Sequence, residues 1–310
     1  MAARIRQELL GCSIYLYPDE QAARAGERAG GSGFMLGRPF PAAGPDQCTL
    51  WAVTNRHVIE QGNWSIRINT VFDGFDVIET NEQEWFFHPE NDDLAIRPLA
   101  TAGGYHRVNY LTTDWLLTKD TLDLYVIGPG DPCFVIGRFI NHEGRQRNTP
   151  TVRFGEIAQS PIEKVSIGGI EQESFLVEIR SIGGYSGSPV FVWLDQAHYR
   201  PIDENTAPDG RKAYRGVFDS GPWLLGVDWC MVPLWEAVHD KHGDELPNGW
   251  QVPVNTGMMG VIPAWRLHWL VMECPEVVAH AAAIEAAELE RLAAIPPATI
   301  LTDVSKGGMF

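Results

Sequence analysis

Short β-rich runs separated by turn-forming residues are the feature that most restricts how this chain can fold. Between about residues 10 and 200, apolar and β-branched stretches of strand length alternate with Gly, Pro, Asn and Asp. Among these runs are CSIYLYP, GSGFML, CTLWAVTN, WSIRINTVF, LAIRPL, CFVIGRFI, TVRFGEIA, SFLVEI and PVFVWL. Such a series is typical of antiparallel barrels and sandwiches. The sequence therefore predicts an all-β core.

Helical periodicity appears only near the end of the chain. Residues 263–294 carry apolar side chains at helical spacing, and Pro275 is expected to divide them into two helices because proline interrupts a helix. Two polar stretches rich in turn formers, residues 199–222 and 233–255, are predicted to be loops inserted between strands. The second contains a candidate short helix near LWEAVHDKH.

The composition excludes several classes of partner. The 40 acidic and 24 basic residues give a formal charge of −16, which repels phosphate backbones and anionic lipid surfaces. No stretch has the length and apolar character of a signal peptide or a membrane span. We therefore expect a cytoplasmic protein that binds neither nucleic acid nor membranes.

The cysteines favour free thiols over cross-links. Their number is odd, they are widely scattered, and no CxxC pair occurs. This pattern argues against a disulfide framework and against a structural zinc site. The five are Cys12, Cys48, Cys133, Cys230 and Cys274.

A candidate nucleophile lies in the stretch RSIGGYSGSPVFV, residues 180–192. A serine hydroxyl is a poor nucleophile at neutral pH, so catalysis needs a base and donors that stabilise an oxyanion. The glycines at 184 and 187 allow a sharp turn around Ser186, and the amides of Gly184 and Ser186 could point at one carbonyl oxygen. Taken alone, such a turn is more often structural than catalytic.

Two further residues become informative only in combination with this serine. His57 follows the apolar strand in WAVTNRHVIE, and Asp93 precedes an apolar strand in HPENDDLAIRPL. A single histidine at a strand end is usually an ordinary surface or core residue, and an aspartate at that position is usually a turn former. The order His, Asp, Ser along the chain changes this interpretation.

With these three motifs in this order, the sequence resembles the trypsin-like serine proteases of chymotrypsin fold, of the bacterial type that is not activated from a zymogen. The similarity extends over roughly residues 10–274. It is carried by TNRHVI at 54–59, DDLAI at 92–96 and GYSGSPV at 184–190, with support from GSGFML at 31–36, LLGVDW at 224–229 and GMMGVIP at 257–263.

The resemblance implies a role for each matching residue. His57 would be the general base, Asp93 would orient it, and Ser186 would attack the scissile carbonyl. The backbone amides of Gly184 and Ser186 would form the oxyanion hole. Asp92 is the alternative acid, but the family pattern of Asp, an apolar residue and Ala fits Asp93 better.

The resemblance also implies an architecture of two antiparallel six-stranded barrels packed face to face, with the active site between them and helices at the C-terminus. We place the N-terminal barrel at residues 1–115, with His57 and Asp93. The C-terminal barrel is placed at 116–265, with Ser186. A helical extension and tail follow at 266–310.

Two departures from the family pattern concern activation and cross-linking. Where zymogen-activated members carry an aspartate that receives the freed N-terminus, this chain has Tyr185. We therefore expect that N-terminal processing does not switch the protein on. The cysteine that usually follows the family histidine is Val58, which leaves Cys48 without its expected partner.

The substrate-binding residues are predicted to be Arg180, Ser181, Asp228 and Trp229. The nucleophile motif is also similar to that of the glutamyl endopeptidases, whose substrate-binding histidine is replaced by Asp228 in GVDWC. A carboxylate facing the pocket predicts cleavage after a basic residue. If Arg180 reaches Asp228, a neutral or small residue is expected instead. In a third reading, strand alternation turns Asp228 away from the pocket.

These observations predict a serine endopeptidase that acts on protein or peptide substrates without a metal or organic cofactor. Narrow specificity or a partner is expected to restrain it. The alternative is a protease-derived scaffold that binds peptides, or regulates, without turnover. The Ala-rich helix at 276–294 either packs on the catalytic domain or docks a regulatory protein.

Overall fold

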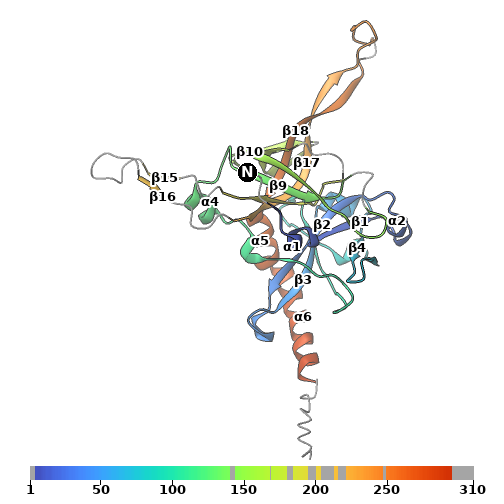
Figure 1. Cartoon of the computed structure of the whole chain (residues 1–310), viewed down its shortest axis with the longest axis vertical. Coiled ribbons are helices and arrows are strands. Elements are labelled where there is room, and N and C mark those ends of the chain that lie inside the picture. Colours follow the sequence, from blue (N-terminus) through green and yellow to red (C-terminus); the bar gives the residue numbers. More distant parts are fainter. Residues whose placement is uncertain are drawn as a thin grey trace, which may run out of the picture.

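Two β units followed by two helices make up the computed structural model shown in Figure 1. The structure describes residues 4–139, 144–167, 169–179, 184–194, 200–203, 213–215, 221–246 and 249–294. Strand pairing groups the chain into an N-terminal sheet within residues 13–112 and a C-terminal barrel within residues 132–263. The fold is thus mostly β with C-terminal helices, which confirms the predicted fold class.

The N-terminal unit is an eight-stranded sheet. Its main path runs β5-β4-β1-β2-β3-β7-β6, and β8 pairs with β2 in parallel. Among the described residues, no pairing joins the end strands β5 and β6, so the sheet remains open where a closed six-stranded barrel was expected. The end strands are short, and short edges offer few backbone groups for closure. The strands are β1 (Ser13–Tyr17), β2 (Gly31–Pro39), β3 (Cys48–Thr54), β4 (Ser65–Asn69), β5 (Phe75–Ile78), β6 (Phe86–Phe87), β7 (Ala95–Pro98) and β8 (Leu111–Thr112).

The C-terminal unit is a closed six-stranded barrel, as predicted. Its strands follow the order β10-β13-β18-β17-β14-β9. Their bounds are β9 (Pro132–Gly137), β10 (Thr151–Gln159), β13 (Phe175–Glu178), β14 (Pro189–Val192), β17 (Trp223–Ala237) and β18 (Gln251–Pro263). Two small ribbons lie outside the barrel, one formed by β11 (Lys164–Ile167) and β12 (Ile170–Glu173), the other by β15 (Arg200–Asp203) and β16 (Ala213–Arg215).

The two β units share one hydrophobic core. Alternate residues of β2 point to opposite faces of the sheet. Phe34 and Leu36 therefore join the large hydrophobic cluster that contains Phe134 and Phe191 of the barrel. Met35, between them in sequence, packs in a smaller cluster on the other face. Within the barrel, the rings of Phe134 and Phe191 stack with their centroids 4.9 Å apart. Burial on both faces fixes the sheet against the barrel and therefore positions the loops that meet between them.

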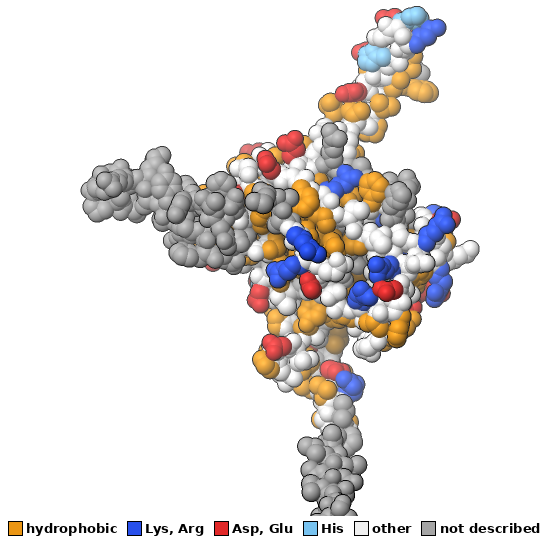
Figure 2. All heavy atoms as spheres, in the orientation of Figure 1, with side chains coloured by type: hydrophobic (Ala, Val, Ile, Leu, Met, Phe, Trp, Pro, Cys, Tyr) orange, Lys and Arg blue, Asp and Glu red, His pale blue; other side chains and the backbone are white. Residues whose placement is uncertain are grey.

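One inserted segment differs from its prediction. Residues 233–255 were expected to form a charged loop with a short helix, but β17 and β18 continue beyond the barrel as a paired ribbon that extends to the pair Ala237 and Gln251. Figure 1 shows this ribbon leaving the body of the molecule at the top. Figure 2 shows hydrophobic side chains exposed along it. Leu234 and Trp235 of β17 are exposed, as is Trp250 just before β18. The prediction failed because the composition of each stretch does not show that β17 and β18 pair with each other along the ribbon.

The other predicted insertion is only partly described. Within residues 199–222, strands β15 and β16 pair with each other, so this stretch is not a simple loop. Residues 204–212 and 216–220 lie outside the described residues.

The C-terminal helices follow the barrel as predicted. Pro275 occupies the first turn of the second helix, where a missing amide costs nothing, and it separates the two helices. Val277 and Ala281 are buried, the His280 ring packs on Phe86, and Glu285 pairs with Arg38 of β2. The helices are α1 (Gln7–Gly11), α2 (Glu20–Ala25), α3 (Arg56–Glu60), α4 (Lys119–Tyr125), α5 (Ala264–Met272) and α6 (Pro275–Ala293), with short 3₁₀ turns at Pro41–Ala43, Glu82–Glu84 and Thr113–Trp115.

All five cysteines are free thiols. Among the described helices, none has both the length and the apolar character that a membrane crossing requires.

Candidate active site

His57 and Asp93 are brought together by the pairing of β3 with β7. His57 lies in α3, directly after β3 ends at Thr54, and Asp93 lies in the turn before β7 begins at Ala95. Thr54 and Ala95 are register partners in this antiparallel pair. The side-chain amide of Asn55 also donates to the backbone carbonyl of Asp93 at 2.8 Å. The fold therefore holds both residues through backbone contacts as well as through their side chains.

Both carboxylate oxygens of Asp93 contact His57. Oδ2 lies 2.6 Å from His57 Nδ1, and Oδ1 accepts the backbone amide of His57 at 2.8 Å. A carboxylate can only accept, so this contact favours the tautomer with the proton on Nδ1 and leaves Nε2 free to act as a base. Asp93 is buried, whereas 28% of the His57 side chain is exposed. The pair thus presents one basic nitrogen to its surroundings.

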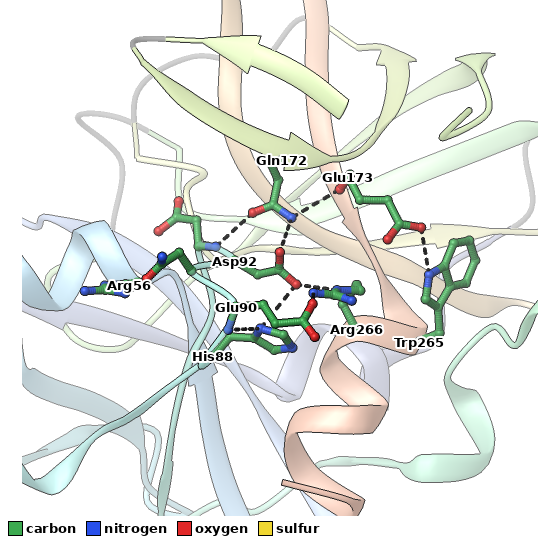
Figure 3. Close-up of polar contacts among 10 residues, drawn as sticks. Arg56, His88, Glu90, Asp92, Gln172, Glu173, Trp265 and Arg266 are labelled. Atoms are coloured by element: carbon green, nitrogen blue, oxygen red, sulfur yellow. Dashed lines mark hydrogen bonds and ion pairs between the residues drawn. The ribbon is translucent and has the colours of Figure 1, made fainter. Parts of the chain in front are cut away.

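Asp92, the alternative acid, has a different set of partners. Its carboxylate pairs with Arg266 of α5, lies 3.4 Å from His88 Nδ1, and accepts from Gln172 Nε2 at 3.0 Å. Figure 3 shows Asp92 between Gln172 and Arg266. Gln172 also accepts the backbone amide of Asp93 at 2.9 Å. Asp92 therefore connects the N-terminal sheet to α5, and Asp93 alone of the two contacts His57 among the described residues.

Ser186 lies in a turn fixed by hydrogen bonds from both β units. Ser32 of β2 donates its amide to the Ser186 carbonyl and its hydroxyl to the Gly184 carbonyl, both at 2.8 Å. Gly187 donates its amide to the carbonyl of Asp228 in β17 at 2.8 Å. Gly184 and Gly187 have φ values of +95° and +86°, a region that favours glycine. These contacts fix the backbone conformation of the turn and leave Ser186 partly exposed.

The turn lies next to the segment that carries His57. A Cβ atom added to Gly31 would come within 2.8 Å of the Val58 side chain and 3.2 Å of the Ser186 carbonyl oxygen. Ser186 and Val58, the residue after His57, therefore both lie next to Gly31 of β2. Among the described residues, no hydrogen bond joins the His57 ring to the Ser186 hydroxyl. Such bonds are often long in unliganded enzymes and shorten when substrate binds.

The amides of Gly184 and Ser186 are the predicted oxyanion hole. Within the described part of the chain neither amide donates a backbone hydrogen bond, while the Gly184 carbonyl is held by Ser32. Two free donors on a constrained turn are what an oxyanion requires.

Tyr185 connects the nucleophile turn to the barrel wall. Its side chain is buried, and its hydroxyl lies 2.6 Å from Thr151 Oγ1 and accepts from Arg153 Nε at 3.1 Å, both on β10. The Arg153 guanidinium also lies 5.4 Å from the ring centroid. The residue before Ser186 is thus fixed by the barrel itself.

Replacing Tyr185 with phenylalanine is expected to lower the free energy of unfolding by about 1–2 kcal/mol, because it removes the hydroxyl that satisfies Thr151 and Arg153. Urea denaturation measures this change. Tyr125→Phe is the matched control, since the Tyr125 hydroxyl makes no hydrogen bond among the described residues. Equal losses in the two variants would contradict the prediction.

The predicted substrate-binding residues are not confirmed as a group. Asp228 is 2% exposed and Trp229 is 4% exposed, and the Trp229 indole N–H donates to Ser174 Oγ at 2.9 Å. Both side chains are therefore buried in this structure, and their role in lining the pocket stays a prediction. The reading in which the strand turns Asp228 away from the pocket agrees with its burial. Arg180 and Ser181 lie outside the described residues.

A cleft of about 590 Å³ opens beside His57. Its walls carry charges of both signs, from Arg56 and Lys164 and from Glu60, Glu90 and Glu171. It also includes His57 and Asp93, so a polypeptide lying there would pass next to the His57 ring. In the described part of the chain, no group of three or more His, Cys, Asp or Glu side chains could hold a metal ion.

Comparison with solved structures gives distant matches. The MamO protease domain from Magnetospirillum magneticum (apo form) matches 85% of this chain and 97% of its own, with 14% identity and a TM-score of 0.48. Deg5 matches 86% of this chain and 92% of its own, with 17% identity and a TM-score of 0.48. The inactive form of the Rv3671c protease matches 86% of this chain and 90% of its own, with 12% identity and a TM-score of 0.43.

These structural neighbours include serine protease domains of bacteria, but the likenesses are distant. No protein-family model matches the chain, and no curated protein matches it. The narrower similarity to glutamyl endopeptidases stays a prediction. The chemistry of the site therefore rests on the side chains described above.

Three residues that support the site were not found from the sequence. Ser32 holds the nucleophile turn through two hydrogen bonds. Asn55 donates to the Asp93 carbonyl, and Gln172 bonds both Asp93 and Asp92. Asn55 stands two residues before His57, so its place in the histidine motif was an available signal. Ser32 and Gln172 carry no local pattern that would identify them.

Proposed function

We propose that this chain is a serine endopeptidase that cleaves protein or peptide substrates by acyl transfer. The observation that carries the proposal is the His57 and Asp93 pair, in which both Asp93 oxygens contact His57 while Nε2 makes no hydrogen bond to any described residue. The constrained turn around Ser186, held by contacts from β2 and β17, supports it.

The proposed reaction has two stages. His57 Nε2 takes the proton from the Ser186 hydroxyl as Oγ attacks the substrate carbonyl carbon, and the amides of Gly184 and Ser186 donate to the resulting oxyanion. His57 then gives that proton to the departing amine, which breaks the peptide bond and leaves an acyl ester on Ser186. Water, deprotonated by His57, releases the acid and restores the serine.

The second candidate is a protease-derived scaffold that binds peptides, or regulates, without turnover. The observation that favours it is the absence, among the described residues, of a hydrogen bond between His57 and Ser186. The two candidates differ in whether Ser186 is chemically reactive.

A fluorophosphonate probe separates them, because it labels only an activated serine. We expect the wild-type chain to be labelled at Ser186, with peptide mapping as the readout, and the Ser186→Ala variant to stay unlabelled. The exposed Ser166→Ala variant is the matched control and should label like the wild type. Failure of the wild type to label at any pH between 6 and 9 would support the scaffold.

Restraint by a regulatory protein on the C-terminal helix also belongs to this proposal. Beyond Glu285, α6 presents Leu289 and Leu292 to solvent, while Val277 and Ala281 in its first turns are buried. The same helix can therefore both pack on the catalytic unit and contact a partner. A cytoplasmic location without nucleic-acid or membrane binding remains a prediction from composition.

A further inference from the structure

The three residues of the proposed triad are divided between the two β units. His57 and Asp93 lie in the N-terminal unit, whereas Ser186 lies in the turn before β14 of the barrel. The proposed reaction requires His57 Nε2 to meet the Ser186 hydroxyl, so contacts that fix one unit against the other affect its rate. Ser32 of β2 provides such a contact to the nucleophile turn.

Gln172 of β12 provides the corresponding contact to the acid. The carbonyl of Asp93 is bound by Asn55 and its carboxylate by His57, both of which belong to the N-terminal unit. The Asp93 amide instead donates to Gln172 Oε1 at 2.9 Å. Among the described residues, this is the hydrogen bond that joins Asp93 to the C-terminal part of the chain.

The neighbours of Gln172 fix the direction of its side-chain amide. The Asp93 amide is a donor and must meet Oε1, while the Asp92 carboxylate is an acceptor and takes Nε2 at 3.0 Å. Figure 3 shows the Gln172 side chain reaching Asp92, which pairs on its other side with Arg266. The Gln172 side chain is fully buried. One orientation of this amide therefore satisfies both partners.

The backbone of Gln172 is connected to the strand that holds the nucleophile turn. Its carbonyl accepts from Ser174 Oγ at 3.2 Å, and Ser174 Oγ accepts from the Trp229 indole N–H at 2.9 Å. Trp229 lies on β17, which binds the nucleophile turn through the backbone of Asp228. Contacts through Gln172 thus run without interruption from the acid to the strand behind the nucleophile.

The strand that carries Gln172 also forms a wall of the cleft beside His57. Ile170 and Glu171 line this cleft, whereas Gln172 is buried. Successive side chains of a strand point to opposite faces, so β12 directs Glu171 to the cleft and Gln172 to the acid. A polypeptide in the cleft would therefore contact the strand that holds Asp93.

We propose that Gln172 is a positioning residue that aligns the His57 and Asp93 pair with Ser186 across the two β units. This inference rests on the proposed protease function. Loss of the Gln172 side chain would leave the bonds between Asp93 and His57 intact but free the pair to shift relative to Ser186. A shift of about 1 Å can lower a rate on the order of 100-fold.

Gln172→Met tests this role in the kinetics. Methionine has a similar length and volume but cannot donate, and its sulfur accepts only weakly. We expect kcat for a short peptide to fall about 10- to 100-fold while KM stays within about threefold of wild type. Gln251→Met, at the exposed last pair of the β17 and β18 ribbon, is the matched control and should keep the wild-type rate. A wild-type kcat in Gln172→Met, or a loss confined to KM, would overturn the proposal.

Gln172→Glu tests the bonding pattern through pH, and it keeps the side-chain length if the methionine change impairs folding. When protonated, the introduced carboxyl accepts from the Asp93 amide and donates to Asp92, as glutamine does. When ionised, it loses its donor and repels the two carboxylates. The ratio of its kcat/KM to that of wild type should therefore fall as pH rises between about 6 and 9. A ratio that does not change with pH would contradict the proposed pattern.

The charged and titratable groups around position 172 come from three elements. They are His88, Asp92 and Asp93 of the segment before β7, Arg266 of α5, and Glu173 of β12 itself. Arg266 is already paired with Asp92 and Glu90. The nearby carboxylates therefore favour the protonated form of the introduced carboxyl and raise its pKa above that of an exposed glutamate.

Hydrogen exchange at the Asp93 amide tests the contact without relying on turnover. Because Gln172 accepts this amide, its exchange should be on the order of tenfold faster in Gln172→Met than in wild type, as measured by NMR. Gln251→Met should exchange at the wild-type rate. Equal exchange in all three proteins would show that Gln172 does not hold Asp93.

The kinetic and exchange measurements distinguish failure of the inference from failure of the proposed function. If the wild type neither cleaves peptides nor labels with the probe, the protease proposal fails, and the positioning role fails with it. Faster exchange in Gln172→Met would then establish only a structural contact. If the wild type is active and Gln172→Met keeps its kcat, the inference alone is wrong.

Discussion

Replacing Ser186 with alanine is expected to lower kcat/KM for a peptide substrate by roughly 10⁴- to 10⁶-fold, because the change removes the hydroxyl of the proposed nucleophile. His57→Ala should cost a similar amount, since the base and the nucleophile act as one unit. The double variant should be no slower than either single variant. Steady-state kinetics on a cleaved peptide measure all three.

The fold should survive these changes, because the turn is held by the backbone groups of Ser186 and by Gly187. Thermal denaturation should therefore give Tm values close to that of wild type. Retained activity in purified Ser186→Ala, with contaminating proteases excluded by a second purification, would show that Ser186 is not the nucleophile.

Replacing Asp93 with asparagine should lower kcat by about 10⁴-fold at neutral pH while leaving the fold intact. The asparagine side chain can present an N–H to His57 Nδ1, which favours the tautomer with the proton on Nε2. That tautomer cannot accept the Ser186 proton. The effect should be visible as loss of both peptide turnover and probe labelling.

Asp92→Asn is the matched comparison, since it makes the same chemical change one residue away. Its partners are Arg266, His88 and Gln172, so we expect a loss of about 1–3 kcal/mol of stability and little change in kcat. A large loss of kcat in Asp92→Asn with a normal rate in Asp93→Asn would reverse the assignment of the acid.

The order of the motifs carried more information than any motif alone. His57, Asp93 and Ser186 each had an ordinary structural interpretation, but their order is characteristic of one family. The choice of Asp93 over Asp92 also came from the sequence, through the apolar residue and alanine that follow it. The structure agrees with this choice, since Asp93 is the carboxylate that contacts His57.

Contacts between distant segments could not be obtained in this way. Gln172 lies 79 residues from Asp93 and 80 from Asp92 along the chain, yet it binds both. The ribbon of β17 and β18 depends on the pairing of residues such as Leu234 and Val254, and prolines on both strands obscure its alternation. Composition reports the polarity of such stretches but not the partners that convert them into strands.

By itself, the sequence determined the all-β class, the helices divided at Pro275 and the three residues of the candidate triad, because each depends on local patterns or on motif order. Only the tertiary structure decided that the N-terminal sheet stays open and that Asp228 is buried behind the nucleophile turn. The physical reason is that a side chain's burial, and therefore its charge, depends on the segments that pack around it. Asp228 carries the same carboxyl group as Asp93, but its burial raises its pKa well above the ordinary range.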